Sequence, residues 1–427
     1  MASSTADPDP AASSTPLHPS ILFDAHAYIG DRPNGTTAEE LTSSNRSIQV
    51  SIWAAAPPSP SRLFVHIPNL DPDLFCDEAH IVCSADGVLL LRVCIVWPKI
   101  PLQKKKKEED YFIYRYQAGR PSLRRLPKPL PFNDDEAGLL PRGEHFTIAV
   151  LSVSLNGFNL QLFKSETWNW TNVSKVPVVT KQRPFPIQIP RNAARLNMHI
   201  TTTVITLGGK GGTMGWVDLW RGILFCDVLS ATPTLRGVPL PLPSALINHH
   251  KGIDGCPKPN RGIAVVDGCL RMVELDVHGE ILPNHDPETG LHNFRVDNWE
   301  LCMYTNRRIT GAWEDWQLEH RVEASNINID PAMHWKLRHS GLLYNKTEEG
   351  KERKLQNLLP CQPTLSLDDQ GAVYLLTKVK FMQPEAWVLA VDVKGNKIQA
   401  LAEFGIDRTL GLSLAYCPSR ISSYMDA

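Results

Sequence analysis

Short apolar runs alternate along most of this chain with stretches rich in Gly, Pro, Asn and Asp. The runs are rich in β-branched and aromatic residues, and apolar residues seldom recur at three- and four-residue spacing, so the pattern predicts strands. The prolines lie almost entirely between the runs, where a missing amide donor leaves a sheet intact. Predicted strands include SIQVSIWAA, GVLLLRVCIV, HFTIAVLSVSL, GWVDLWRGILFCDVL, RGIAVVDGCLRMVELDV and EAWVLAVDV.

An internal repeat organises these strands. The segment PSLRRLPKPLP at 121–131 aligns without gaps on PTLRGVPLPLP at 233–243, with seven of eleven positions identical. Both copies follow an apolar run and a short turn, so each unit is predicted to be a strand, a tight turn, a second strand and a proline-rich exit. Two looser relatives are LQLFKSETWNWTNVSKVP and, with a Gly-Asn turn, AWVLAVDVKGNKIQALAEF.

Repeated strand pairs favour an all-β, β-propeller-like fold, because radial stacking of small sheets covers the faces of each sheet. At roughly 45 to 50 residues per blade, the chain has room for about six to eight blades of short antiparallel strands. Two packed β-sandwiches are the alternative.

One propeller-like domain is expected over 21–427, after a disordered leader at 1–20. The leader has neither a basic segment nor an apolar core, so we expect no secretory signal. The longest apolar stretch, at 88–97, is too short to span a bilayer and contains an arginine. We also expect a solvated lysine-rich loop near 103–110 and a partly helical insertion near 334–359.

The overall charge excludes some partners. Lys and Arg total 44 against 45 Asp and Glu, so no net field attracts nucleic acid or an anionic membrane. A cytoplasmic location, with access to the nucleus, is expected. The nine cysteines lack zinc-site spacing and are interpreted as reduced core thiols.

No motif identifies an enzyme. The glycine-rich stretch LGGKGGTMG at 207–215 lacks the GK[ST] of a phosphate loop and precedes a predicted strand, so we interpret it as a loop between strands. Histidines at 249, 250, 285, 334 and 339 show no metal-ligand spacing, and no nucleophile motif occurs. We therefore expect no metal, no cofactor and no catalytic residue.

The segment GWVDLWRGILFCDVL at 215–229 resembles the signature of a large grass-plant family, domain of unknown function sixteen-eighteen. The stretches LFDAHAYIGD, APPSPSRLFVHIP and YCPSRISSYMDA also resemble that family, from about residue 22 to the C-terminus. The resemblance implies no known activity, and it fits a propeller. The strand-turn-strand units are also similar to the associated domains of plant F-box proteins, but no F-box-like helical segment precedes them.

The candidate binding residues are Trp216, Asp218, Trp220 and Arg221. On one continuous strand, Trp216, Asp218 and Trp220 would share a face. Asp218 or Arg221 could then recognise a polar group of a ligand. In the structural alternative, which we favour, Asp218 accepts hydrogen bonds from a neighbouring turn and the tryptophans pack blades together.

Two functions from different classes remain open. The first is a non-enzymatic scaffold that binds a protein partner through its loops or one face of the propeller. The second is a hydrolase or lyase with its site at the central channel, where polar residues from several blades converge.

Overall fold

The computed structural model describes residues 18–96, 107–155, 157–179, 199–243, 255–285, 290, 292–310, 312–343, 352–368, 371–380, 383, 385–404 and 415–425. The described chain is almost entirely β-structure, as the short apolar runs predict. The expected leader falls mostly outside these residues, as do 103–106 of the lysine-rich segment.

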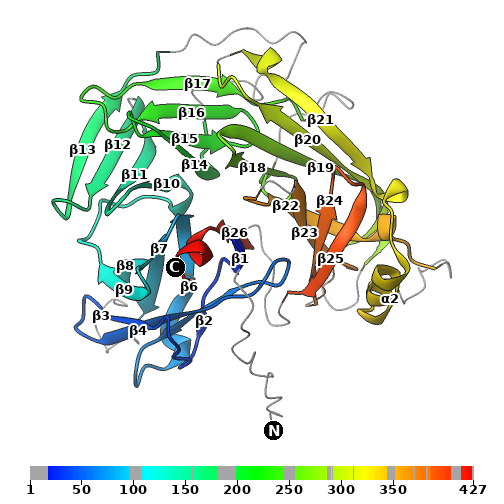
Figure 1. Cartoon of the computed structure of the whole chain (residues 1–427), viewed down its shortest axis with the longest axis horizontal. Coiled ribbons are helices and arrows are strands. Elements are labelled where there is room, and N and C mark those ends of the chain that lie inside the picture. Colours follow the sequence, from blue (N-terminus) through cyan, green and yellow to red (C-terminus); the bar gives the residue numbers. More distant parts are fainter. Residues whose placement is uncertain are drawn as a thin grey trace.

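Six four-stranded sheets follow one another along the chain, and we number them I to VI (Figure 1). In sheets II to VI each strand pairs antiparallel with the next one in sequence, whereas sheet I has the order β2-β5-β4-β3 with β2 parallel to β5. The strands of sheets I to III are β2 (Tyr28–Ile29), β3 (Ala38–Leu41), β4 (Ser47–Trp53), β5 (Arg62–His66), β6 (Phe75–Ala85), β7 (Val88–Val96), β8 (Lys107–Gln117), β9 (Arg120–Arg125), β10 (Ala137–Arg142), β11 (His145–Ser154), β12 (Gly157–Lys164) and β13 (Asn169–Val176).

Sheets IV to VI continue the same order round the molecule. Their strands are β14 (Thr203–Gly208), β15 (Thr213–Asp218), β16 (Gly222–Asp227), β17 (Leu235–Pro239), β18 (Arg261–Val266), β19 (Cys269–His285), β20 (His292–Asn306), β21 (Trp316–Glu323), β22 (Leu359–Leu365), β23 (Ala372–Lys378), β24 (Trp387–Asp392) and β25 (Lys397–Glu403). The α-helix α2 (Pro331–His339) lies within the segment that joins sheets V and VI. Short 3-10 helices are Pro72–Leu74, Asp134–Glu136, Trp313–Asp315, Ala324–Asn326, Leu355–Asn357 and Ile421–Tyr424.

The two ends of the described chain pair with each other. Strand β1 (Ile21–Asp24) is antiparallel to β26 (Tyr416–Ser419) and touches the start of β5, because the N–H of Asp24 donates to the carbonyl of Ser61 at 2.9 Å. Along β1, Ile21 and Phe23 pack with sheets I and II, while Leu22 packs with sheet VI. The pair β1–β26 therefore joins the last sheet to the first.

Each interface between neighbouring sheets has a hydrophobic cluster of its own, and these clusters form the core. Sheets I and II share one cluster with β1, four further clusters fill the interfaces from II–III to V–VI, and a sixth joins sheet VI to β1 and β26. The propeller-like fold with six sheets is thus the one expected, and the sheets do not form the two packed sandwiches of the alternative.

The aligned repeats occupy equivalent places in the fold. The segment 121–131 begins in β9, the outermost strand of sheet II, and 233–243 contains β17, the outermost strand of sheet IV. The two looser relatives lie on β12–β13 and β24–β25, which are also the third and fourth strands of their sheets. Matched leucines at 123 and 235 are buried, as are Leu126 and Val238.

The aligned segments 121–131 and 233–243 also accept hydrogen bonds from the sheet that follows their own. The indole Nε1 of Trp170 on β13 donates to the carbonyl of Pro127 at 2.9 Å, and that of Trp316 on β21 donates to the aligned Pro239 at 2.7 Å. Two further indole bonds that join sheet cores to connecting segments run from Trp216 to Glu136 and from Trp299 to Leu355. Tryptophan thus supplies both apolar area and a hydrogen-bond donor at four joints.

One expectation needs correction. Residues 107–110 of the expected solvated loop belong to β8, where the carboxylates of Glu108 and Asp110 are buried and accept hydrogen bonds from Ser43 and Ser44 of the β3–β4 turn. Local charge could not reveal this contact, because it joins two sheets. The expected helical insertion near 334–359 contains most of α2, the 3-10 helix Leu355–Asn357 and the start of β22.

The expectation of nine reduced cysteines is also wrong, since Cys94 on β7 is disulfide-bonded. Strand register decides which thiols meet, and sequence spacing does not show it. The free thiols among the described residues are those of Cys83, Cys226, Cys256, Cys269, Cys302, Cys361 and Cys417.

Replacing Trp316 with Phe should lower the free energy of unfolding by about 2 kcal/mol, because the Pro239 carbonyl loses its donor in a buried joint. Urea denaturation measures the change. Trp335→Phe is the matched control, since Trp335 on α2 is 60% exposed and should lose little. Equal losses of unfolding free energy in W316F and W335F would contradict a stabilising role of the Trp316–Pro239 hydrogen bond.

Candidate functional site

The predicted binding residues surround the turn between β15 and β16 in sheet IV. Asp218 ends β15 and Gly222 begins β16, so Trp220 and Arg221 lie in a tight turn. The expectation of one continuous strand with Trp216, Asp218 and Trp220 on one face is therefore wrong at Trp220. The five-residue span Asp218–Gly222 closes because the N–H of Arg221 donates to the carbonyl of Asp218 at 3.0 Å.

The Asp218 carboxylate organises this turn. Its Oδ1 accepts hydrogen bonds from the backbone N–H groups of Trp220 and Arg221 at 3.0 and 3.2 Å. Its Oδ2 accepts from the backbone N–H of Ile200 at 2.9 Å and pairs with Nη1 of Arg221 at 2.8 Å. The carboxylate is only 1% exposed, so these bonds replace its solvation.

The two tryptophans of the segment make different contacts. Trp216 is fully buried between sheets III and IV, and its Nε1 donates to the carbonyl of Glu136 at 2.7 Å. Trp220 donates to the carbonyl of Gly255 at 3.1 Å and lies 5.7 Å from the guanidinium of Arg261. Both tryptophan side chains therefore contact other residues of this chain. A ligand contact by Asp218 or Arg221 stays a prediction.

A buried histidine lies near this turn and was missed by the sequence reasoning. His199 is 3% exposed, neither ring nitrogen has a hydrogen-bond partner, and burial lowers its pKa to about 4. Asp218 opposes this shift and Arg221 adds to it. The ring is therefore neutral at physiological pH. No motif could identify it, because its burial depends on the surrounding sheets.

The central cavity is lined by the first strands of sheets II to VI and by β26. Its volume is about 450 Å³. The lining includes Ser84, Thr202, Thr206, Gln362, Tyr416 and Ser419, together with the charged residues Asp134, Asp135, Lys258, Arg261 and Arg420. The expected convergence of polar residues at the channel is therefore present.

Several charged groups at this cavity form ion pairs. Asp134 is contacted through Oδ2 by Nε2 of His80 at 2.8 Å and by Nε of Arg92 at 2.9 Å. Both oxygens of Asp135, before β10 in sheet III, lie 2.7 Å from Nζ of Lys258, before β18 in sheet V. The Asp135–Lys258 pair therefore links sheet III to sheet V across the intervening sheet IV, at one end of the cavity.

Thiol chemistry is unfavourable in the cavity. Cys83 and Cys417 both line it. Burial raises the pKa of the Cys417 thiol to about 12 and that of Cys83 well above its usual range. Because the thiolate is the nucleophile, these side chains are poorly suited to covalent catalysis.

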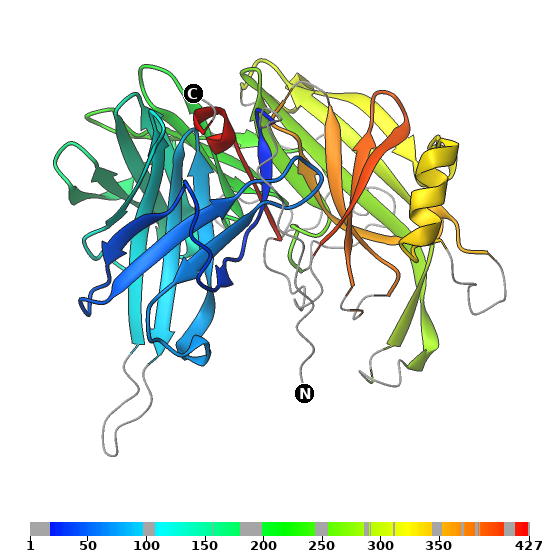
Figure 2. The ribbon, with the colours of Figure 1, turned by 60° about the horizontal axis from the view of Figure 1, so that its bottom comes forward.

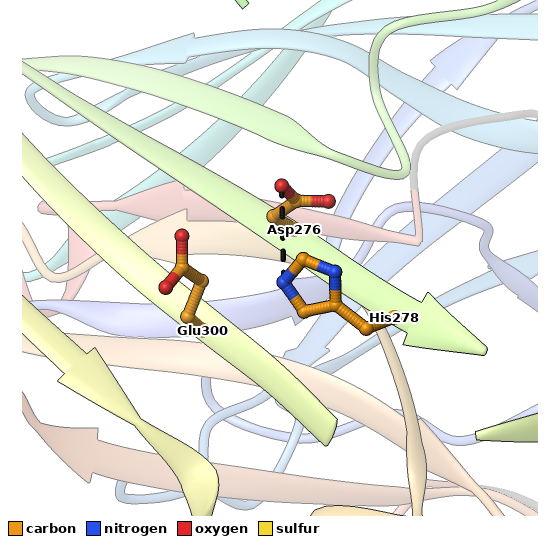
Figure 3. A group of neighbouring side chains, drawn as sticks. All are labelled: Asp276, His278 and Glu300. Carbon is orange, nitrogen blue, oxygen red and sulfur yellow. Dashed lines mark ion pairs between the residues drawn. The ribbon is translucent and has the colours of Figure 1, made fainter. Parts of the chain in front are cut away.

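A second group of polar side chains lies on the long hairpin of sheet V. Asp276 and His278 alternate on β19, and Glu300 is the direct cross-strand partner of Asp276 on β20 (Figure 3). Ligand atoms of all three lie within 4.8 Å of one another, with Nε2 of His278 4.0 Å from Oδ2 of Asp276. Figure 3 shows the three side chains on the same side of the two strands.

This group was also missed from the sequence. The Asp-Val-His spacing at 276–278 was the available signal, since residues two apart share a face of a strand. Glu300 joins them only through the register of β19 and β20. Of the histidines considered earlier, His334 and His339 lie on α2 and His285 near the hairpin tip, while residues 249 and 250 lie outside the described residues.

Comparison with known proteins finds a family that part of the chain matches. Residues 216–374 match a family described as "Protein of unknown function (DUF1618)". This segment is a DUF1618 match. The resemblance noted in the sequence is thus confirmed from Trp216 in β15 to Tyr374 in β23. The DUF1618 segment contains the Asp218 turn, the hairpin of sheet V and the Asp276, His278 and Glu300 group. No curated protein matches.

A solved structure that matches is a sialidase from Trypanosoma rangeli. The identity is 10% and the TM-score 0.22, over 93% of this chain and 52% of the sialidase chain. This chain spans about half the length of that protein. Such a low score carries no argument about fold or activity.

Asp218→Asn should lower the free energy of unfolding by about 2 to 3 kcal/mol, because the amide removes the buried charge that pairs with Arg221 and replaces an acceptor oxygen. Chemical denaturation measures the loss. Asp227→Asn, at an exposed site at the other end of the same hairpin, is the control. An unchanged stability in D218N would contradict the structural role.

His199→Phe should flatten the dependence of stability on pH between about 6.5 and 4. The folded pKa is about 4 and the ordinary value 6.5, so in this interval the unfolded chain binds the proton first and stability falls as the pH decreases. Phenylalanine cannot titrate, and neither ring nitrogen loses a partner. Urea midpoints at pH 7, 5.5 and 4.5 test this. An equal fall in stability with decreasing pH in the wild type and in H199F would refute this prediction.

Proposed function

We propose that this protein is a non-enzymatic interaction scaffold, with a protein partner bound at one face of the propeller. The observation that carries the proposal is the presence of exposed large apolar side chains at the same end of three successive sheets, III, IV and V. Such side chains, surrounded by polar residues, are a common feature of protein-binding surfaces.

The strand order defines this face. In each sheet the second strand is antiparallel to the first, so the turn from second to third strand lies beside the start of the first strand. In sheet IV, for example, Thr203 at the start of β14 pairs with Val217 near the end of β15. We call this end of sheets III to V the turn face.

Apolar side chains are exposed on the turn face of all three sheets. Val153 and Leu155 lie at the β11–β12 turn and are 53% and 106% exposed. Ile200, which donates its N–H to Asp218, is 64% exposed. Ile281 and Phe294, on β19 and β20, are 70% and 42% exposed. These residues lie at the end of each sheet that carries the turn from its second to its third strand.

The β19–β20 hairpin extends the turn face furthest. Arg261, the first residue of β18, pairs with Glu274, so the residues of β19 after Glu274 run beyond the start of β18. Figure 2 shows this hairpin, in yellow-green at the lower right, extending beyond the rest of sheet V. Ile281 and Phe294 are direct cross-strand partners on it. Their adjacent side chains offer a compact apolar contact for a partner.

The double variant Ile281→Ser with Phe294→Ser should reduce recovery of a reproducible partner at least about tenfold, because binding energy concentrates in a few apolar anchors. Quantitative affinity capture from the source tissue measures the recovery. The control is Trp335→Ser, which removes an exposed aromatic side chain on α2. Recovery that is equal in both variants, or no reproducible partner for the wild type, would refute the proposal.

A hydrolase or lyase site at the central cavity is the second candidate, favoured by the charged residues Asp135 and Lys258 at one end. Lys258→Met would abolish activity toward aryl esters or aryl glycosides if this candidate were correct. The absence of turnover by the wild-type protein on such a panel would exclude these reactions.

A cytoplasmic location, with access to the nucleus, belongs to the same proposal. No helix among the described residues has the length and apolarity needed to cross a bilayer. The disulfide at Cys94 weighs against a reducing compartment. Cell fractionation tests the location, and alkylation of free thiols tests whether Cys94 is oxidised in the cell.

A further inference from the structure

We propose that Asp276, His278 and Glu300 form a binding site for a divalent transition-metal ion, with Zn²⁺ as the best-fitting ion. The site lies at the base of the β19–β20 hairpin. It is independent of the proposed partner binding, since it requires none of the exposed apolar residues.

The backbone brings the three ligands together without any local motif. Asp276 is directly opposite Glu300 in the antiparallel ladder, and His278 lies two residues further along β19 on the same face. Zn²⁺ bonds to imidazole nitrogen and carboxylate oxygen are about 2.0 to 2.2 Å long, so ligand atoms of one ion lie roughly 3 to 3.5 Å apart. The observed separations of up to 4.8 Å require movements of about 1 Å. The His278 side chain, which is 48% exposed, has room to make them.

A fourth polar group lies on the same face as the three proposed ligands. Asn298 is the direct cross-strand partner of His278, and its Oδ1 is a buried atom without a hydrogen-bond partner. Buried amide oxygens in proteins normally accept a hydrogen bond. A water molecule bound to the ion would supply the missing donor, because three protein ligands leave a position open on Zn²⁺.

Arg321 competes with a metal ion for the carboxylate of Glu300. Its Nε and Nη2 donate to Oε2 of Glu300 at 3.0 and 2.7 Å, while its side chain is 59% exposed. The pair keeps the buried Glu300 carboxylate neutralised when no ion is bound. The cluster holds two carboxylates, and a divalent cation would be attracted to both of them.

The donor set selects the kind of ion. One imidazole nitrogen with two carboxylates suits Zn²⁺ better than Ca²⁺ or Mg²⁺, which prefer oxygen ligands alone.

Isothermal titration of the full-length protein with ZnCl₂ tests the site, and visible absorption of bound Co²⁺ reports its ligands. We expect one ion per chain at this site, with no competition from a large excess of Mg²⁺. His278→Ala should weaken Zn²⁺ binding at least about tenfold and change the Co²⁺ spectrum. Glu300→Gln should have the same effect by removing another ligand.

Two further variants distinguish this site from adventitious binding. His292→Ala is the matched control, because His292 is an exposed histidine of the same hairpin whose ring lies 4.0 Å from that of His285. It should leave affinity unchanged. Arg321→Gln should tighten binding several-fold by releasing Glu300. Equal affinity in wild type and H278A, loss of binding in H292A, or weaker binding in R321Q would each overturn the proposal.

Discussion

The structure depends on covering both faces of every sheet at once. A small four-stranded sheet with two apolar faces is stable only between two neighbours, and a row of such sheets would leave a face uncovered at each end. The pair β1–β26 covers part of both end sheets, since Leu22 packs against sheet VI and Phe23 against sheets I and II. The central cavity lies among the first strands of the sheets arranged in this way.

Much of this arrangement could be predicted from the chain. The apolar runs and the prolines between them indicated short strands, and the two aligned segments lie on the outermost strands of sheets II and IV. Those segments were recognisable because packing requires the same residue types at both places. Leu235 and Val238 must be buried, and Pro239 must present its carbonyl to Trp316.

The rest depended on contacts between residues far apart in sequence. Trp220 belongs to a turn because the Asp218 carboxylate accepts hydrogen bonds from the backbone N–H groups of Trp220 and Arg221. An alternating pattern of residues cannot show where a strand turns back. Asp276 and His278 were visible as a pair, but their proximity to Glu300 depends on strand register. The buried acids of β8 and the disulfide at Cys94 are similar cases.

The tryptophan joints have a consequence for how such a ring could have arisen. The contact from a proline carbonyl to an indole links sheet II to III and recurs from IV to V. The aligned segments are likewise two sheets apart. The same joint thus recurs at an interval of two sheets, in the pairs II–III and IV–V. Duplication of a gene fragment that encodes two sheets would copy each proline together with its tryptophan.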